Sequence, residues 1–186
     1  MNSPSDTARV SALFWCPEAG APMIAASRLS VEQGRGVAGD RYALGAGAYS
    51  AMEPIKDRHL TLITQDAIDT ANAWQQASGR EPFDAALTRR NVVIESMSAQ
   101  SLNDLVGERF LIGSVLCEGL EFATPCERPS TLSGIDGFPE AFDGRGGLRA
   151  RVLSSGPIDV GMSLALACAA TLATARRNAL ADSGAA

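Results

Sequence analysis

The 186-residue chain is poor in several residues on which common enzyme classes depend. It has a single histidine, His59, and no serine elbow, so a Ser-His-Asp hydrolase is a poor fit. It has a single lysine, Lys56, so any Schiff-base chemistry would have to use that residue. The formal net charge is −5 and no basic stripe is visible, which speaks against a nucleic-acid partner, because phosphate neutralisation supplies most of the affinity in such complexes.

Metal-finger and membrane signals are also missing. No CxxC pair or metal-finger spacing occurs among the four cysteines, Cys16, Cys117, Cys126 and Cys168. Residues 1–10 contain no apolar signal core, and the longest apolar stretch, 164–175, is too short to span a bilayer. We therefore expect a cytoplasmic protein with reduced thiols and no membrane partner. Cys117 and Cys168 lie in apolar stretches, where we expect small buried hydrophobes.

What the sequence does contain is a succession of short strand patterns separated by glycine. Helical spacing predicts one longer helix at 65–77 with Thr64 as its N-cap, and short helical turns at 83–87 and 98–105. Alternating or β-branched runs predict strands at 10–15, 29–39, 59–64, 91–95, 108–112, 115–122 and 148–153. We expect a mainly β fold, a small Greek-key or closed β-barrel with a few short helices, rather than a parallel α/β sheet.

Neither an internal repeat nor a linker divides the chain. We expect one domain over residues 1–186, with a core at about 10–165 and an Ala-rich tail at 166–186. The tail begins with a strand-like LALA and should end as a helix that carries solvated Arg176 and Arg177.

The segment 124–129, with the sequence TPCERP, is the strongest candidate for reactive chemistry. Prolines on both sides of Cys126 fix the local backbone, and Arg128 can favour the thiolate form of the cysteine. A thiolate binds soft metals or attacks electrophiles. The alternative, a small buried hydrophobe, suits a polar, proline-braced loop poorly.

Arginine supplies fifteen of the sixteen cations. Its planar fork suits phosphates and oxyanions, although genomic base composition could also explain the bias. Arg90, at the start of a strand, could bind a phosphate while Asn91 ties down a neighbouring loop, or it could be a solvated turn residue. The GDR at 39–41 could be an Asx turn with a surface ion pair, and it is no dinucleotide fingerprint. His59 alternates with leucines, which favours a structural role.

These motifs together are more specific than any one of them. The chain contains, in order, GRGVAGDRY, KDRHLTLITQDAID, RRNVVIE, LNDLVGERFLIGSVLCEG, TPCERP and GLRARVLSSGPIDVGM. This series strongly resembles the MOSC domain, named after the C-terminal domain of molybdenum-cofactor sulfurases, over roughly residues 29–162. The chain departs from the family pattern at Gly161-Met162, where the family usually shows Gly-Asp, and it carries no fused ferredoxin or aminotransferase-like domain.

The resemblance implies a β-barrel with a pocket for the pterin-based molybdenum cofactor. It implies that Cys126, the cysteine of the PC motif, is the molybdenum ligand and the catalytic centre. We expect the other cofactor-binding residues to include Asp40, Arg41, Arg58, Arg90, Asn91 and Arg149, with several of the arginines converging on the cofactor's phosphate. We expect no bound pyridoxal phosphate, because only Lys56 could form its aldimine.

Three functions remain open from the sequence. The leading hypothesis is a molybdenum-cofactor oxidoreductase that reduces N-hydroxylated or N-oxide compounds, with a small-molecule substrate and a separate electron-donating reductase as partners. The second is a carrier or binding module that holds the cofactor, or sulfur as a Cys126 persulfide. The third is a barrel that has kept its fold and lost its ligand.

Overall fold

The computed structural model describes residues 7–53 and 57–168. The helices are α1 (Gln65–Ala77), η1 (Ala85–Thr88), α2 (Ala99–Asn103), α3 (Arg128–Ser133) and α4 (Phe138–Ala141). The strands are β1 (Arg9–Trp15), β2 (Ile24–Ala26), β3 (Arg28–Glu32), β4 (Gly36–Val37), β5 (Leu60–Thr64), β6 (Val92–Glu95), β7 (Arg109–Ile112), β8 (Val115–Phe122), β9 (Leu148–Val152), β10 (Gly156–Asp159) and β11 (Leu164–Leu166).

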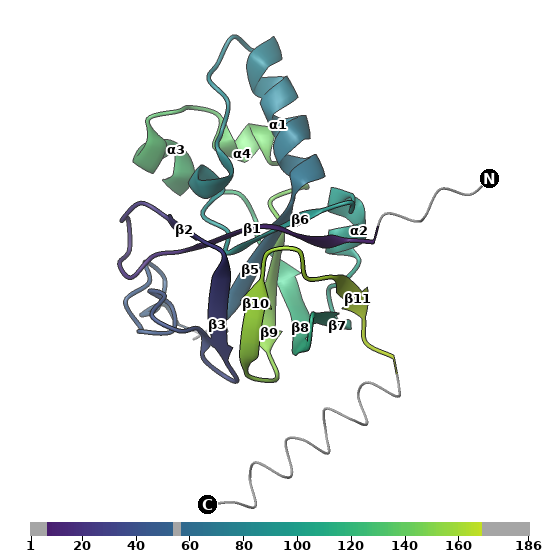
Figure 1. Cartoon of the computed structure of the whole chain (residues 1–186). Coiled ribbons are helices and arrows are strands. Elements are labelled where there is room, and N and C mark those ends of the chain that lie inside the picture. Colours follow the sequence, from purple (N-terminus) through teal and green to yellow (C-terminus); the bar gives the residue numbers. More distant parts are fainter. Residues whose placement is uncertain (1–6, 54–56, 169–186) are drawn as a thin grey trace, which may run out of the picture.

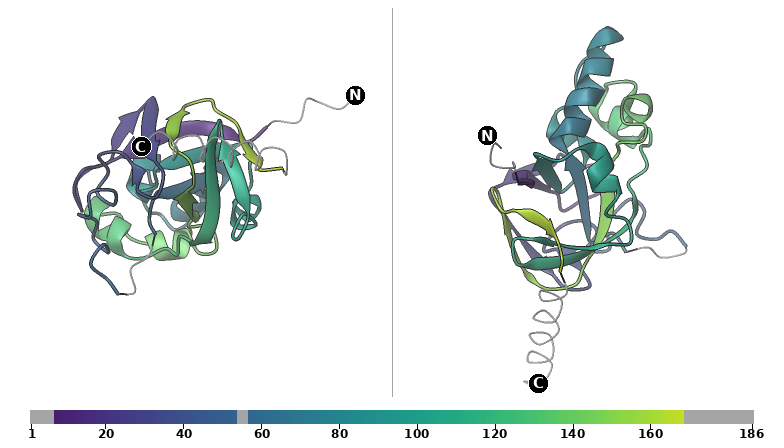
Figure 2. Two further views of the ribbon diagram at one scale, coloured as in Figure 1. Left: turned by 90° about the horizontal axis from the view of Figure 1, so that it is seen from below. Right: turned by 90° about the vertical axis from the view of Figure 1, so that its right-hand side faces the viewer.

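Most of the strands belong to one strongly curled sheet, whose order is β11-β7-β8-β9-β5-β6-β1-β2, and the order of a smaller sheet is β10-β3-β4. Viewed from below, the strands wrap around a common interior (Figure 2, left). Nearly all neighbours are antiparallel, but β5 and β6 are parallel and are joined through α1. The mainly β class with few helices is therefore confirmed, with one β-α-β connection that the strand patterns did not predict.

The expected closure of the barrel is not shown. Backbone hydrogen bonds do join the two ends of the curl: the Val10 N–H donates to the Met162 carbonyl (2.8 Å), and the Leu164 N–H donates to the Ala8 carbonyl (2.8 Å). The Gly161 N–H also donates to the Val10 carbonyl (2.8 Å), but in the described residues the two segments form an isolated bridge between Arg9 and Ser163 and not a strand ladder. The sheet is thus a strongly curled half-barrel, because β11 is short and pairs along its length with β7 alone.

Two hydrophobic clusters hold the fold. The first fills the interior of the curled sheet, with Leu60, Leu62, Phe110, Leu148 and Ile158 fully buried. The second lies between the sheet and the helices α1 and α4, which stand together at one end of the molecule (Figure 1). Every residue of β5 is buried, because one face of this strand meets each cluster.

Helix α1 follows directly from its sequence. The Thr64 side chain accepts the Ala67 N–H at its start, and Ala67, Ile68 and Ala71 share the buried face. Three phenylalanines pack beside it: Phe138 and Phe142 stack at a centroid distance of 4.3 Å, and Phe83 meets Phe138 edge-on at 5.1 Å. This layer supports η1 and α3, which border the pocket described below.

Six predicted strands match β1, β5, β6, β7, β8 and β9 to within one residue at each end, and the helix at 65–77 has the predicted bounds. The single strand predicted at 29–39 is wrong in its extent, because a turn divides this stretch into β3 and β4. Helices α3 and α4 and strands β2 and β10 were not predicted. The tail helix with Arg176 and Arg177, and Lys56, lie outside the described residues. Within the described part of the chain, no helix has the length and apolarity to cross a membrane.

Candidate functional site

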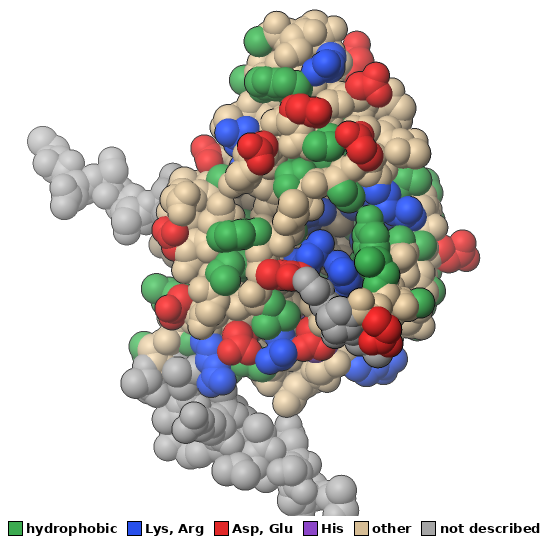
Figure 3. Space-filling model, turned by 180° about the vertical axis from the view of Figure 1, so that it is seen from behind, with side chains coloured by type: hydrophobic (Ala, Val, Ile, Leu, Met, Phe, Trp, Pro, Cys, Tyr) green, Lys and Arg blue, Asp and Glu red, His purple; other side chains and the backbone are tan. Residues whose placement is uncertain are grey.

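A pocket of about 650 Å³, including its open mouth, lies where the loops after β4 and β8 meet the ends of β5, β6 and β9. Arginines dominate its wall, and no described aspartate or glutamate lines it. The lining residues are Ala19, Gly20, Arg41, Tyr42, Ala48, Tyr49, Arg58, Thr61, Arg89, Arg90, Thr124, Cys126, Arg128, Pro129, Phe138 and Arg149. Figure 3 shows cationic side chains gathered in a hollow on the face seen from behind.

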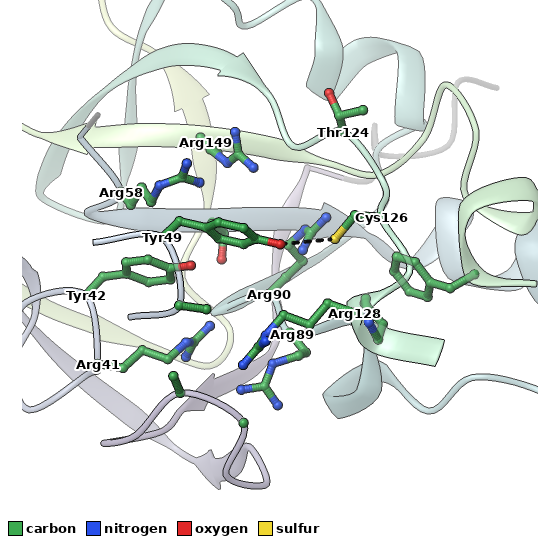
Figure 4. Close-up of a pocket in the computed structure, with 16 residues that line it drawn as sticks. Arg41, Tyr42, Tyr49, Arg58, Arg89, Arg90, Thr124, Cys126, Arg128 and Arg149 are labelled. Carbon is green, nitrogen blue, oxygen red and sulfur yellow. Dashed lines mark hydrogen bonds between the residues drawn. The ribbon is translucent and has the colours of Figure 1, made fainter. Parts of the chain in front are cut away.

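Cys126 borders this pocket from the loop between β8 and α3, and its residue is exposed. The Tyr49 hydroxyl lies 3.8 Å from the Cys126 sulfur (Figure 4). This contact and partial burial raise the pKa of Tyr49, so the phenol keeps its proton at neutral pH. Cys126 therefore presents an accessible sulfur beside a hydroxyl that can donate to it.

Asp40 and Asn91, both predicted to bind the cofactor, do not line the pocket. Asp40 is 3 % exposed and Asn91 4 %. The Asp40 carboxylate accepts the Cys16 and Tyr42 backbone N–H groups and pairs with Arg41 at 3.0 Å. The Asn91 amide oxygen accepts from Thr61, and its NH₂ group donates to the Phe14 carbonyl and to Asp40. Both side chains use their hydrogen bonds to hold loops beneath the pocket, and a direct contact of either residue with a cofactor stays a prediction. The Asx turn at Asp40 is present, but its ion pair is buried.

Arg90 lines the pocket and at the same time ties its wall together. Its guanidinium donates to the carbonyls of Gly146 (2.8 Å), Thr88 (3.0 Å) and Ala123 (3.0 Å). Burial, and next the charge of Arg149, lower the pKa of Arg90 to about 10, which leaves it charged at neutral pH. The three carbonyls belong to three segments, one of which leads to Cys126, so Arg90 sets the position of the cysteine loop.

The glycines of the GRGG segment serve packing. A Cβ at Gly147 would lie 2.0 Å from the Leu62 carbonyl oxygen, and one at Gly146 would lie 2.3 Å from the Ala123 carbonyl oxygen. Only glycine permits this approach of the loop to β5 and to the cysteine segment. The same approach brings the Gly146 carbonyl within reach of Arg90.

Two carboxylates partly balance the six arginines. Arg41 pairs with Asp40, and Arg149 on β9 pairs with Glu121, its cross-strand neighbour on β8. Arg58 stacks on the rings of Tyr49 and Tyr42, at 5.1 and 5.8 Å from their centroids, and its Nε is buried without a hydrogen-bond partner. Arg128 makes neither a hydrogen bond nor an ion pair within the described part of the chain. The pocket therefore carries a clear excess of positive charge in a protein whose net charge is −5.

The structure brings together the arginines singled out in sequence, Arg41, Arg58, Arg90 and Arg149, with Cys126 around this one pocket. Their role towards a cofactor stays a prediction. Sequence reasoning missed Tyr42 and Tyr49 and did not assign pocket roles to Arg89 and Arg128. Arg89 and Tyr42 are adjacent to the predicted site residues Arg90 and Arg41, and Arg128 is two residues from Cys126, whereas no local pattern marks Tyr49.

The remaining titratable residues lie in other surroundings. Cys117 is buried on β8 as expected, and burial raises the pKa of its thiol to about 12. Cys168 was predicted to be buried and is exposed, because it follows β11 at the end of the sheet. His59 accepts the Val152 N–H through Nδ1, in line with its predicted structural role. Nowhere in residues 7–53 and 57–168 do three His, Cys, Asp or Glu side chains gather as a metal site.

The chain resembles several solved structures. It superposes on YuaD from Bacillus subtilis with a TM-score of 0.69, at 17 % identity over 85 % of this chain and 94 % of YuaD. For YiiM from Geobacillus stearothermophilus the TM-score is 0.60, at 17 % identity over 87 % of this chain and 75 % of that one. For YiiM from Escherichia coli it is 0.58, at 17 % identity over 86 % and 70 %. These identities support the fold alone. No protein of curated function matches the chain.

The family model of the MOSC domain matches residues 37–165, a stretch that includes the cysteine segment 124–129 and all six pocket arginines. The match covers more than half of the sequence and agrees with the curled β fold, and the chain therefore belongs to the MOSC domain family, whose members are associated with the molybdenum cofactor.

Proposed function

We propose that this protein binds the pterin-based molybdenum cofactor in the arginine-lined pocket and uses it to reduce N-hydroxylated or N-oxide compounds. The observation that carries the proposal is the presence of one accessible thiol, Cys126, on the wall of a pocket that, among the described residues, is lined by six arginines and by no carboxylate. A soft sulfur donor suits molybdenum, and a cluster of guanidinium groups suits a phosphate.

The residues present fit such a group. Arg58 has a buried Nε that lacks an acceptor, which an anionic ligand would provide. An arginine cluster without ligand is also costly, since like charges in a partly buried pocket repel one another. A ligand with a phosphate offsets both costs. Among the described residues no three His, Cys, Asp or Glu side chains gather as a metal site, which fits a metal that is bound mainly by the cofactor.

In this proposal Cys126 is the protein ligand to the metal, and Arg58 and Arg149 hold the phosphate, while Arg41 lines the other side of the pocket. When bound, the cofactor would supply the two-electron chemistry that cleaves an N–O bond with release of water. Arg90 keeps the cysteine loop in place through its three carbonyl contacts. Tyr49 holds a proton next to the sulfur, and its ring, stacked on Arg58, covers part of the pocket.

The proposed reaction also needs an electron donor, a substrate and a reducing compartment. The electrons would come from a separate reductase, and the substrate would be a small molecule. We place the protein in the cytoplasm, where its thiols stay reduced. We expect no pyridoxal phosphate, because Lys56 is the only lysine of the sequence.

The exposure of Cys126 favours a second candidate function. A thiol that a partner protein can reach could carry sulfur as a persulfide, or deliver the cofactor. In that case the pocket arginines would hold the cofactor during transfer only.

Two measurements test these proposals. Protein purified from a host that makes the cofactor should contain about one molybdenum and one pterin per chain, and Cys126→Ser should lose the metal while keeping the wild-type fold. The loaded protein should then reduce benzamidoxime with an artificial electron donor. Cofactor without turnover would favour the carrier. Full molybdenum content and turnover in Cys126→Ser would falsify the assignment of the ligand.

A further inference from the structure

The six pocket arginines form two groups on opposite sides of the Tyr49–Cys126 contact. In Figure 4, Arg58 and Arg149 lie on one side of the line from Tyr49 to Cys126, and Arg41, Arg89 and Arg128 lie on the other. Arg90 stands behind the two groups. The phosphate proposed above needs two or three cations, so the second group exceeds what one phosphate requires.

The second group gathers at the loop that follows β1. Arg41 and Arg89 both donate to the buried Cys16 sulfur, at 3.1 and 3.4 Å, so their guanidinium groups are neighbours. Arg89 also donates to the Ala21 carbonyl at 3.0 Å. The Arg128 Nη2 approaches the same loop, since a Cβ at Gly20 would lie 3.6 Å from it. Burial, and next the charge of Arg41, lower the pKa of Arg89, and Arg128 adds to this effect.

The backbone at Arg89 is in the left-handed region, with φ 62° and ψ 27°. This conformation is costly for a residue with a Cβ, and at the end of a helix glycine usually adopts it. The backbone conformation at position 89 thus favours glycine, yet the chain has an arginine there. The conformation directs the side chain towards Cys16 and the pocket, where Arg89 joins two further cations.

Among residues 7–53 and 57–168, Arg41 is the one member of the second group with a carboxylate partner, Asp40. Arg89 donates to a carbonyl and a thiol, which leaves its charge unbalanced, and Arg128 donates to nothing in the described residues. Three adjacent guanidinium groups with one carboxylate form a site that favours an anion.

We propose that Arg89 and Arg128, backed by Arg41, form a second anion subsite that binds a carboxylate or phosphate on the substrate, so that the pocket selects anionic N-hydroxylated compounds over neutral ones. Arg128 is the first residue of α3 and only two residues from Cys126, which places this subsite beside the reactive sulfur. A group that exchanges at every turnover belongs there, whereas the buried Nε of Arg58 suits a ligand that stays. This inference rests on the proposed function for the identity of the substrate, but the anion subsite itself does not.

A matched pair of compounds tests the subsite: benzamidoxime, which is neutral, and 4-carboxybenzamidoxime. On the loaded enzyme the carboxylated compound should have a KM ~10–100-fold lower, as a charge-assisted contact to one or two arginines predicts. Arg128→Gln should reduce this ratio to near one. Arg58→Gln, the matched control in the other group, should lower the molybdenum content and leave the ratio of the two KM values as it is.

Direct binding separates the subsite from the reaction. Protein made without the cofactor should bind 4-carboxybenzamidoxime in calorimetry, and Arg128→Gln should weaken this binding ~10-fold or more, whereas Arg58→Gln should not. Equal affinity of wild type and Arg128→Gln for the carboxylated compound would overturn the subsite. Arg128-dependent binding in a protein that takes up no molybdenum would uphold the subsite and reject the proposed function.

Discussion

The pocket wall and the layer beneath it contain two kinds of polar side chain, which differ in how many of their hydrogen-bonding groups have partners within the protein. In the network beneath the pocket, Asp40, Asn91 and Arg90 each make several hydrogen bonds to backbone or side-chain partners. On the open side, Arg58 has an unpartnered Nε and Arg128 makes no hydrogen bond in the described residues. Buried polar groups are normally paired, so the first set maintains the shape of the pocket and the second set is available to a ligand.

The comparison changes how the arginines of the sequence are interpreted. Arg90 opens the strand β6 and was a natural candidate for a phosphate ligand. Its donors are largely taken by three carbonyls, so it acts as a positioning residue for the cysteine loop. Arg128, noted in the sequence only for its effect on the thiol, has all of its donors available.

The largest effect on stability should come from replacing Arg90, whose guanidinium is hydrogen-bonded to three carbonyls. Arg90→Met leaves three enclosed carbonyls without their donor, and we expect the free energy of unfolding to fall by about 3–5 kcal/mol, since each orphaned acceptor costs roughly 1–3 kcal/mol before relaxation. Urea unfolding measures this loss. Arg128→Gln is the matched control and should change stability by no more than about 0.5 kcal/mol. Equal stability of the two variants would remove the distinction between the paired and unpaired arginines.

The cysteines provide a second contrast of the same kind. Cys117 is buried on β8 with a raised pKa, whereas Cys126 is exposed on the pocket wall. Cys117→Ser should cost about 1–3 kcal/mol, because it buries a hydroxyl in an apolar site. Cys126→Ser should stay within about 0.5 kcal/mol of wild type. Thermal or urea unfolding of both variants checks this, and a large loss in Cys126→Ser would mean that the thiol supports the fold.

How far the sequence predicts the molecule depends on the range of the interactions involved. Helix α1 was predicted with its bounds because Thr64 and the spacing of Ile68 and Ala71 are local signals. Cys126 stood out because its prolines are adjacent to it. The hydrogen bond from Arg90 to Gly146 spans 56 residues and that from Tyr49 to Cys126 spans 77, and no local pattern encodes such contacts.

The differences from the sequence-based expectations have the same origin. A residue such as Asp40 has the chemistry of a ligand-binding group, and only the tertiary structure shows that its carboxylate is already occupied. Strand patterns likewise predict strands but not whether the last one pairs with the first, so the closure of the barrel was expected and the curled half-barrel was not.

A smaller effect should appear in the pH dependence of stability. Burial lowers the pKa of His59 below its usual value of about 6.5, and its Nδ1 accepts a backbone N–H, so the folded state holds the neutral ring. The unfolded chain binds the proton more readily. The stabilisation is therefore full above the unfolded pKa and decreases as the pH falls from about 6.5 towards the lower folded value. His59→Gln should be less pH-dependent than wild type in urea unfolding between pH 5 and 8. Identical profiles would contradict the buried neutral histidine.

The smallest effect, and the sharpest probe of the open side, concerns Tyr49. Its hydroxyl lies 3.8 Å from the Cys126 sulfur, and its raised pKa keeps it protonated, so it can donate to a thiolate but cannot accept from one. Tyr49→Phe removes that donor and keeps the ring that stacks on Arg58. A hydrogen bond to a charged group contributes about 1.5–3 kcal/mol, and part of this is offset because a sulfur without the hydrogen bond is more nucleophilic, so alkylation of Cys126 by iodoacetamide should slow by about three- to tenfold.

Tyr42→Phe is the matched control for this experiment. The Tyr42 ring also stacks on Arg58, at 5.8 Å, but no hydrogen bond joins its hydroxyl to Cys126 in the described residues, so the alkylation rate should stay at the wild-type value. Cys126→Ser identifies the reactive site by mass spectrometry, because Cys168 is also exposed. A faster reaction in Tyr49→Phe would show that the phenol shields the sulfur instead of stabilising its charge. Equal slowing in both tyrosine variants would trace the effect to the arginine stack, and the two sides of the pocket wall would then be less independent than their hydrogen bonds suggest.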